Sequence, residues 1–488
     1  MDKLFRKIKY ILLIIFIVNI SFNDLFADKK AKYHVIIDTD CAADDLRATC
    51  MLLASSKVEV LAITTSDGAL NPQEGLVKVN ALLKTFGHEG IPYAAGKTLQ
   101  NTPPVYRTFA QSINWGDENF ININYKMNAE DLITSSIELE EKPITIVVMG
   151  PLTNIFNFLQ KNQEKQNEIE RIIWYNEQIH PAKGTNYKTD KNAADYILNQ
   201  KIKIDVISIG EVAYSVNEDF LQALGKIKSP YAQKIVCSHK NSEIIQKIKS
   251  KHLKFWDDLV PIFLLYPDLF NSKKFNKFPA QSIHSATDYK EIEKKIITIL
   301  DCDKQDKSIV LKRFPDNPTW IREDVAKHMN QIIEKHGRKE WKIVTLTNEF
   351  HEHLGIYSII GAKMGLRARE YFNVDIDELK IVSYAGNTPP ISCLNDGLQV
   401  STGATLGHGT ISITNEFSPR PQADFSFKTT TLSLILKDEY WEIIKNDVRQ
   451  GIEQYGNLTD EYWQFIRELA IQYWLEWDRR EIFNLEIN

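Results

Sequence analysis

One short stretch near the start of the chain most constrains what the chain can fold into. The apolar run Val35–Ile37 is typical of a buried parallel strand. Four carboxylates follow it within eight positions, at Asp38, Asp40, Asp44 and Asp45. The turn after this strand is therefore the first candidate for a functional site.

The residues after the acidic turn, 46–54, predict a buried helix, so strand, turn and helix begin a βαβ unit. Ligands bind to open α/β sheets outside the carboxyl ends of the strands, where this turn is expected. Close carboxylates repel one another unless a cation neutralises them, and oxygen ligands in this number suit Ca²⁺ or Mg²⁺. The competing interpretation is a solvated acidic loop that caps the helix.

Length and charge narrow the class of protein. The chain has 488 residues, more than one core usually holds, so we expect two domains. A net charge of −5 and the lack of a basic patch with interleaved aromatic residues argue against nucleic-acid binding. Five cysteines, an odd number at wide spacing, argue against a disulfide framework.

The first 27 residues predict a secretory signal peptide. A basic segment up to Lys9 precedes the apolar stretch Tyr10–Val18, and cleavage is expected after Ala27. The mature protein would then be exported, periplasmic or secreted, with no membrane span. An uncleaved N-terminal anchor is the alternative, although the apolar stretch is shorter than the roughly 20 residues that span a bilayer.

Strand patterns alternate with helix patterns in the first part of the chain. Strands are expected at 58–65, 144–149, 172–176 and 202–209, and helices at 74–86 and from 155. This alternation predicts an α/β domain over 28–322, with a mostly parallel sheet and helices on both faces. A smaller α+β domain is expected over 323–488. Its segment 441–483 is rich in Trp and Tyr at helical spacing, and would pack on the core or against a second copy of the chain in a homo-oligomer.

Four segments in order resemble the inosine–uridine-preferring nucleoside hydrolases, over about residues 33–320. The segments are Asp38–Asp45 (DTDCAADD, against the signature DxDxGxDD), Gly150–Asn154 (GPLTN), Asn186–Ala194 (NYKTDKNAA) and Trp256–Val260 (WDDLV) with its continuation to Phe270. The resemblance implies that family's α/β fold. It also implies hydrolysis of the N-glycosidic bond of ribonucleosides or related N-ribosides.

The resemblance further implies a calcium site. Its ligands would be Asp40, Asp45, Asp257 and the backbone carbonyl of Met149. Asp40 would also take the proton from a water bound to the ion, which attacks the anomeric carbon. Bound Ca²⁺ would position that water and lower its pKa, and a carboxylate would serve as general base.

The resemblance places the substrate against four residues: Asp44, Asn186, Asp257 and Trp256. Asp44 and Asn186 would hold the ribose diol, because carboxylate and amide oxygens both accept hydroxyl protons. The ring of Trp256 would stack on the base.

Several positions depart from the family pattern. Ala42 replaces a Gly, and Cys41 precedes it where Pro is usual. Gly184 replaces a Glu that contacts the ribose 5′-hydroxyl, and Trp256 replaces a His that protonates the leaving base. His180 could substitute for that His or be an ordinary surface residue. These departures put the activation of the leaving group, and hence the substrate, in question.

The second part of the chain resembles the FmdE family, named for formylmethanofuran dehydrogenase, over about residues 345–415. The resemblance rests on an HxH segment, Phe350–Gly355, and on the run Cys393–Gly409. It implies His351, His353 and Cys393 as candidate ligands of a second metal, such as Zn²⁺.

Two cysteines usual in that family are absent here, because Gly355 and Ala404 stand in their places. The alternative is therefore a retained scaffold with core His and Cys residues.

Together, these features predict an exported, calcium-dependent N-ribosyl hydrolase that acts on a small-molecule nucleoside or N-riboside. Two alternatives remain open: a degenerate hydrolase that only binds a nucleoside or ribose, and a metal-dependent activity carried by the C-terminal domain.

Overall fold

We describe the fold from a computed structural model, over residues 31–118, 127–209, 214–276, 278–302, 310–311, 314, 317–414 and 418–488. The predicted signal peptide lies outside these residues, so export stays a prediction. Within the described ranges no helix combines the length and the apolar character needed to cross a membrane.

The N-terminal part of the described chain is built on one sheet. Eight strands lie in the order β3-β2-β1-β4-β5-β8-β10-β9. All neighbours pair in parallel except β9, which is antiparallel to β10. The strands are β1 (Tyr33–Thr39), β2 (Val58–Thr65), β3 (Tyr93–Ala95), β4 (Ile144–Val148), β5 (Ile169–Tyr175), β8 (Ile204–Ser208), β9 (Phe270–Phe275) and β10 (Phe278–Ala286). The predicted, mostly parallel sheet is confirmed.

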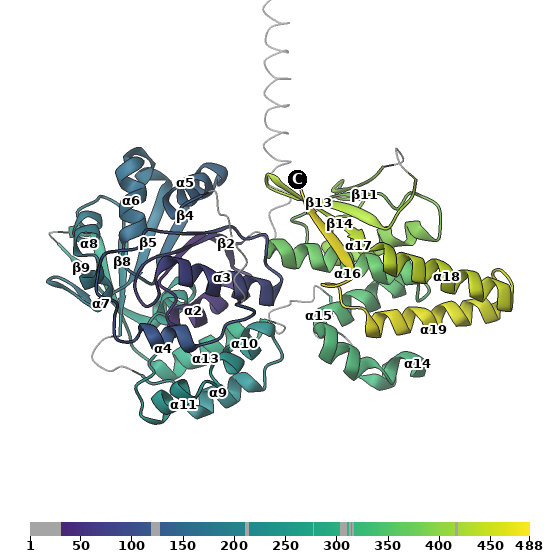
Figure 1. Cartoon of the computed structure of the whole chain (residues 1–488), viewed down its shortest axis with the longest axis horizontal. Coiled ribbons are helices and arrows are strands. Elements are labelled where there is room, and N and C mark those ends of the chain that lie inside the picture. The colour runs from purple at the N-terminus through teal and green to yellow at the C-terminus, as the bar shows by residue number, and fades with distance from the viewer. Residues whose placement is uncertain are drawn as a thin grey trace, which may run out of the picture.

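Helices cover both faces of this sheet (Figure 1). Val35 and Ile37 of β1 are fully buried in one core, whereas Ile36 is buried in the core on the other face. This follows from the alternation of side chains along a strand. The helices of the two layers are α2 (Ala43–Ala54), α3 (Pro72–Phe86), α9 (Glu218–Gly225), α10 (Pro230–Ser238), α11 (Ser242–Lys249), α12 (Leu259–Leu265) and α13 (Tyr289–Leu300) on one face, and α5 (Ala129–Leu139), α6 (Thr153–Lys161) and α8 (Lys191–Leu198) on the other.

The start of α3 is set by its local sequence. The Asn71 side chain accepts a hydrogen bond from the backbone N of Glu74 (3.0 Å), and the Glu74 carboxylate accepts one from the backbone N of Asn71 (3.1 Å). Pro72 occupies the first turn, and Gly87, with φ +74°, ends the helix. A capping box and a left-handed C-cap fix both helix ends. The β2–α3 connection is therefore held in place from its far side.

A second core lies in the C-terminal part of the chain, beside the first in Figure 1. A mixed sheet has the order β12-β11-β13-β14-β15, from β11 (Lys380–Ser383), β12 (Ile411–Ile413), β13 (Gln422–Phe427), β14 (Thr430–Leu436) and β15 (Phe483–Ile487). Its helices are α14 (Glu323–Ala326), α15 (Met329–Phe350), α16 (Ile356–Phe372), α17 (Leu394–Thr402), α18 (Asp438–Tyr455) and α19 (Asp460–Glu476). The helices expected at 441–483 are α18 and α19. Trp474 of α19 is 1% exposed, so α19 packs on this core.

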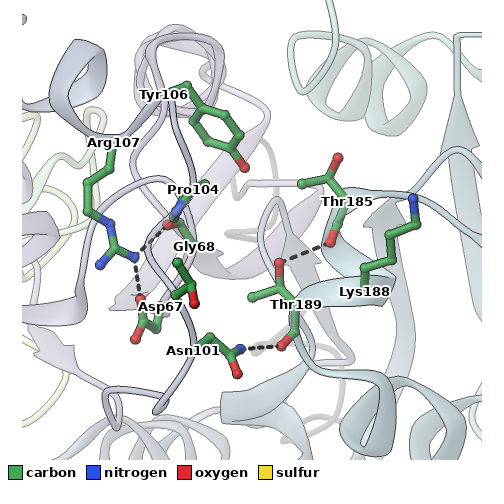
Figure 2. Close-up of a pocket in the computed structure, with 10 residues that line it drawn as sticks. Asp67, Gly68, Asn101, Pro104, Tyr106, Arg107, Thr185, Lys188 and Thr189 are labelled. Atoms are coloured by element: carbon green, nitrogen blue, oxygen red, sulfur yellow. Dashed lines mark hydrogen bonds and ion pairs between the residues drawn. The ribbon is translucent and has the colours of Figure 1, made fainter.

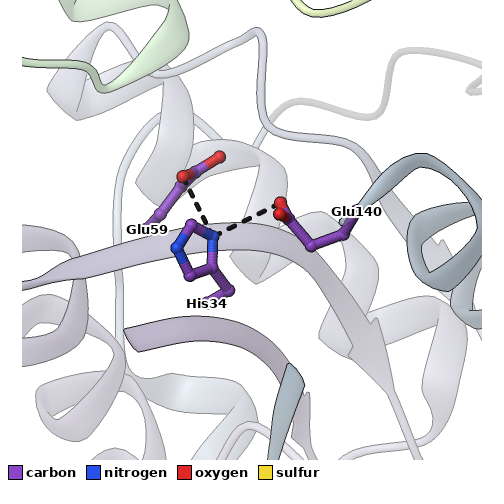
Figure 3. A group of neighbouring side chains, drawn as sticks. All are labelled: His34, Glu59 and Glu140. Atoms are coloured by element: carbon purple, nitrogen blue, oxygen red, sulfur yellow. Dashed lines mark ion pairs between the residues drawn. The ribbon is translucent and has the colours of Figure 1, made fainter. Parts of the chain in front are cut away.

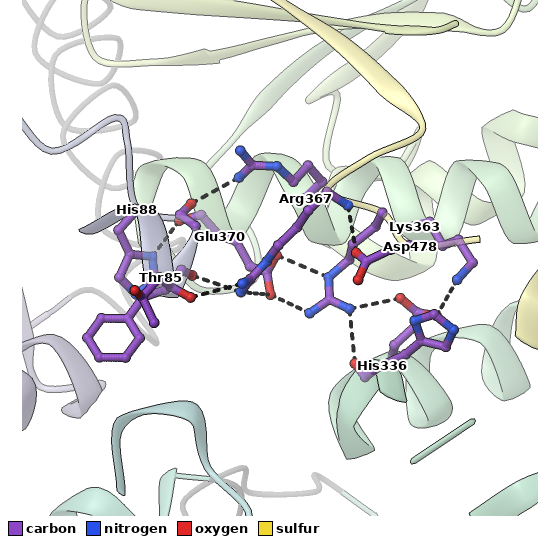
Figure 4. A network of polar contacts seen from close by, with 12 residues as sticks. Thr85, His88, His336, Lys363, Arg367, Glu370 and Asp478 are labelled. Carbon is purple, nitrogen blue, oxygen red and sulfur yellow. Dashed lines mark hydrogen bonds and ion pairs between the residues drawn. The ribbon is translucent and has the colours of Figure 1, made fainter. Parts of the chain in front are cut away.

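The second body is joined to the first at the C-terminal end of α3 (Figure 4). Arg480 donates to the carbonyl oxygens of Thr85 (2.9 Å) and Phe86 (3.1 Å), and Arg367 donates to that of Gly87 (2.9 Å). The last carbonyls of a helix lack partners within the helix, and cations are favoured there. The two arginines therefore complete a helix of the other body.

Behind these arginines lies a chain of buried ion pairs. Arg479 bonds Glu370 (2.5 Å) and Glu340 (3.0 Å), and Glu340 also accepts from Lys363 (2.6 Å). The Lys363 and Glu340 side chains are 1% and 0% exposed. Charges buried so deeply need partners on every side, and this alternation supplies them.

A second contact between the bodies lies at the amino ends of β1 and β2 (Figure 3). His34 Nδ1 lies 3.2 Å from Glu59 and 3.3 Å from Glu140. Lys428, in the β13–β14 turn, bonds both carboxylates, with 2.7 Å to Glu140. Burial alone would lower the pKa of His34, but hydrogen bonds to Glu140 and Glu59 and their charges outweigh it, and the pKa rises from 6.5 to about 9. Lys428 supplies the neighbouring cation for the acidic pair.

His34 gives a pH dependence of stability with a definite sign. Because its pKa is higher in the folded state, its contribution is complete below pH 6.5 and is lost as the pH rises through about 9. The loss is at most about 3 kcal/mol. We expect the thermal midpoint of the wild type to fall over this range by more than that of His34→Gln. Exposed His252→Gln, the control, should follow the wild type, and parallel profiles for wild type and His34→Gln would contradict the assignment.

Candidate active site

The candidate site lies at the carboxyl ends of neighbouring parallel strands. The acidic turn follows β1, Asp67 and Gly68 follow β2, Met149 follows β4, and Asn176 follows β5. These strands are adjacent in the order β2-β1-β4-β5, so the segments after them meet at one edge of the sheet.

Asp44, Asp45 and Asp257 form a compact buried group. One carboxylate oxygen of each lies within 4.8 Å of the others. Asp45 Oδ2 and Asp257 Oδ1 are buried and have no hydrogen-bond partner. Burial, and then the charges of the neighbouring aspartates, raise the pKa of Asp45 and of Asp257 well above the usual value. Converging carboxylate oxygens that lack donors fit a hard divalent cation.

Asp40 borders this group. Its backbone N donates to Asp45 Oδ1 at 3.1 Å. Burial raises the pKa of Asp40 to about 7; backbone hydrogen bonds oppose this shift and the charge of Asp44 adds to it. A Cβ at Gly68 would lie 2.0 Å from Asp40 Oδ2, so a glycine is needed there to make room for the carboxylate.

Asp38, the fourth carboxylate of the stretch, holds the scaffold together. Its Oδ2 accepts hydrogen bonds from Thr64 Oγ1 and Asn154 Nδ2, each at 2.7 Å. Burial raises the pKa of Asp38 to about 6, although these bonds oppose the shift. Asp38 therefore joins β1 to β2 and α6, and it does not belong to the three-carboxylate group.

The turn departs from the geometry that its sequence suggested. Ala42, in the place of the signature glycine, has φ −63° and ψ 171°, which any residue adopts. The left-handed conformation falls instead on Cys41, with φ +62°. Thr39 Oγ1 accepts from Cys41 N at 3.0 Å and donates to Asp45 Oδ1 at 2.8 Å. A proline at 41 could not adopt this φ, so the turn requires the residue that departs from the family pattern.

A buried ion pair, which sequence reasoning missed, positions Asp257. Arg47 of α2 donates to both oxygens of Asp258, from Nε at 2.9 Å and from Nη2 at 2.6 Å. Both side chains are 1% exposed. The pair fixes the segment that carries Asp257 against the helix that carries Asp44 and Asp45. The residues are 211 positions apart, so no local pattern could have paired them.

Asn186 lies at the same edge with a fixed orientation. Its Nδ2 donates to the carbonyl oxygens of Met149 (3.1 Å) and Tyr175 (3.0 Å). Because both amide hydrogens are used, Oδ1 is the atom that remains to accept a hydroxyl proton. The predicted neighbours Met149 and Asn186 are thus in direct contact.

A cavity of about 300 Å³ opens beside the acidic turn (Figure 2). Gly68 and Tyr106 form one side and Thr185 and Lys188 the other, and the Tyr106 hydroxyl points toward Thr185. Burial raises the pKa of Tyr106, and the nearby aspartates, Asp40 first, raise it further. Tyr106 therefore keeps its proton and can donate it in a hydrogen bond. Sequence reasoning missed it because a Tyr in a loop carries no distinguishing spacing.

Two predicted residues lie elsewhere. Trp256 is half-buried and packs against the first core, and it does not line the cavity. His180 lines a separate cavity, with Nε2 2.6 Å from Gln281 Oε1. Neither occupies the place of a proton donor in the cavity beside the acidic turn.

The predicted second metal site is incomplete as the described residues are placed. His351 Nδ1 lies 2.7 Å from Asp396 Oδ2, and the rings of His351 and His353 are 4.1 Å apart between centroids. Within the described ranges, the groups of three or more ligands lie elsewhere, so His351, His353 and Cys393 do not form one. Zinc in this part of the chain stays a prediction.

Comparison with known proteins accounts for both parts of the chain. Residues 35–335 match the family model of inosine-uridine preferring nucleoside hydrolase. The chain belongs to this family. Membership places it among N-glycosyl hydrolases. Residues 350–484 match the model of FmdE, molybdenum formylmethanofuran dehydrogenase operon.

Relatives of this nucleoside hydrolase are distant. It is 24% identical to Uridine nucleosidase 1 of Arabidopsis thaliana, over 49% of this chain and 76% of that protein. It is 28% identical to the pyrimidine-specific ribonucleoside hydrolase RihA of Shewanella baltica (strain OS185), over 41% of this chain and 66% of that protein. The solved inosine-uridine preferring nucleoside hydrolase from Bacillus anthracis is 17% identical, with a TM-score of 0.45 over 55% of this chain and 99% of that one.

The carboxylate group allows a test with two readouts of opposite sign. Asp45→Asn removes one repelling charge and keeps an oxygen for Thr39 and for Asp40 N. The metal-stripped variant should therefore be more stable than the metal-stripped wild type, by about 1 kcal/mol. Its calcium affinity should fall by at least roughly tenfold. Thermal unfolding with chelator and with calcium chloride measures both. Exposed Asp268→Asn is the control, and an unchanged calcium response in Asp45→Asn would contradict the site.

Proposed function

We propose that this protein hydrolyses the N-glycosidic bond of ribonucleosides, or of related N-ribosides, with a bound calcium ion. The observation that carries the proposal is the buried group of Asp44, Asp45 and Asp257. It adjoins Asp40, whose carboxylate lies behind the Gly68 wall of the cavity. Repelling carboxylates beside a cavity match a reaction in which positive charge develops on the sugar.

Asp40, Asp45, Asp257 and the carbonyl oxygen of Met149 would hold the ion. Calcium, when bound, supplies a positioned water of lowered pKa. Asp40 accepts the proton of the attacking water, which is the role of a general base.

The sugar is oriented by side chains that accept hydroxyl protons. Asp44 presents a carboxylate, and Asn186 presents Oδ1 because its amide hydrogens are used by Met149 and Tyr175. Two acceptors at one edge suit a vicinal diol. Such positioning holds the anomeric carbon against the attacking water.

The departing base is received by the cavity. Tyr106 donates a hydrogen bond to it as negative charge develops, since its raised pKa keeps the hydroxyl protonated. The named relatives act on uridine and pyrimidine ribonucleosides, so uridine and cytidine are the first substrates to test.

The absence of a titratable group at Trp256 favours one alternative: a protein that binds the nucleoside without cleaving it. Trp256 has no proton to give a leaving base. An activity of the C-terminal part has less support, because His351, His353 and Cys393 do not converge.

The removal of the general base separates hydrolysis from binding. Asp40→Asn should lower kcat for uridine by about 10²–10⁴-fold, the range for general-base catalysis. Release of reducing sugar from a nucleoside panel, with calcium present, measures it. Exposed Asp268→Asn should retain activity. Wild-type protein that binds nucleosides yet releases no sugar from any of them would contradict hydrolysis.

The leaving-group role of Tyr106 has a separate test. Tyr106→Phe removes the hydroxyl and should lower kcat for uridine by roughly tenfold, the worth of one hydrogen bond. The loss should be much smaller with p-nitrophenyl riboside, whose leaving group departs without such help. Equal losses on the two substrates would contradict the role.

A further inference from the structure

The connection between β5 and α7 (Thr185–Thr189) brings a carboxylate to the place of a missing side chain. A Cβ on Gly184 would lie 1.8 Å from Glu177 Oε2 and 2.3 Å from Asn176 Oδ1. The Glu177 carboxylate therefore fills the space where a side chain at 184 would begin. Gly184 also has φ +137°, which side chains rarely adopt, so the two residues are matched by both space and backbone.

Glu177 is anchored rather than loosely placed. The backbone N of Thr185 donates to its two carboxylate oxygens, at 3.2 and 3.1 Å. The preceding Asn176 is buried and ties the loop together through bonds to the backbone of Gln178 (2.7 Å), Lys183 (2.8 Å) and Tyr187 (3.2 Å). A carboxylate held by a backbone N–H can still accept further hydrogen bonds.

The anchor of Glu177 belongs to the candidate active site. Thr185 lines the cavity, and the next residue, Asn186, is the proposed diol acceptor. Burial raises the pKa of Tyr175, as do the charges of Asp257, Glu177 and Asp44. Glu177 thus shares the electrostatic surroundings of Tyr175 with the buried aspartates.

We propose that Glu177 positions the substrate by accepting a hydrogen bond from the ribose hydroxyl outside the diol, the 5′-hydroxyl. The inference rests on the proposed function. A ribosyl group has one hydroxyl left once Asp44 and Asn186 hold the diol. Glu177 is the carboxylate that borders Asn186 through Thr185. The glycine at 184 is then an exchange of position rather than a loss: the acidic side chain comes from seven residues earlier in the chain.

The test compares uridine with 5′-deoxyuridine in wild type and in Glu177→Gln. The glutamine oxygen can still accept from Thr185 N, so the loop is retained while the charge is removed. The wild type should prefer uridine in kcat/KM by about tenfold to hundredfold, as expected for a hydrogen bond to a charged group. Glu177→Gln should lose most of this preference by losing activity on uridine, with little change on 5′-deoxyuridine.

Exposed Glu164→Gln is the matched control and should keep the wild-type preference. Equal losses of Glu177→Gln on both nucleosides would overturn the proposal in favour of a purely structural role, and so would a wild type without the preference. If the wild type cleaves neither nucleoside, hydrolysis fails but the assignment is still tested by calorimetry with calcium present. Preferential binding of uridine that Glu177→Gln abolishes supports it, and equal affinities overturn it.

Discussion

The mutual repulsion of three buried carboxylates is the constraint on which the N-terminal body depends. Asp44 and Asp45 begin α2, and Asp257 comes from a distant segment. These side chains would move apart in water, so the fold must hold them together by other means. The bidentate pair of Arg47 and Asp258 does so, one residue from Asp257. Its charges are desolvated but fully matched, which favours specificity of position over net stability.

Strain and close packing meet at the same place. Cys41 holds a left-handed backbone conformation, and Gly68 leaves room for the Asp40 carboxylate. Each feature costs stability locally, and each is retained because the surrounding sheet is rigid. The strand β1 that carries the turn is buried on both faces, so its carboxyl end cannot shift to relieve either.

The second body supports the first rather than adding a site of its own among the described residues. Helix α3 starts just after the loop of Asp67 and Gly68, and its other end is completed by Arg367 and Arg480 of the second body. The wall of the cavity is thus held from two sides, by a local capping box and by a distant body. Lys428 adds a second contact, at the amino ends of the strands.

Sequence by itself determined the parallel sheet, the acidic turn and the kind of side chain at Asp40, Asp45, Asn186 and Asp257, because apolar runs and short motifs are local. Tertiary structure alone decided which groups meet. It assigned Asp38 to the scaffold, kept Trp256 out of the cavity and left His351, His353 and Cys393 apart. It also paired Arg47 with Asp258 and placed Glu177 where Gly184 has no side chain. The physical reason is that the separation of two atoms depends on the packing of the whole chain, which no local spacing encodes.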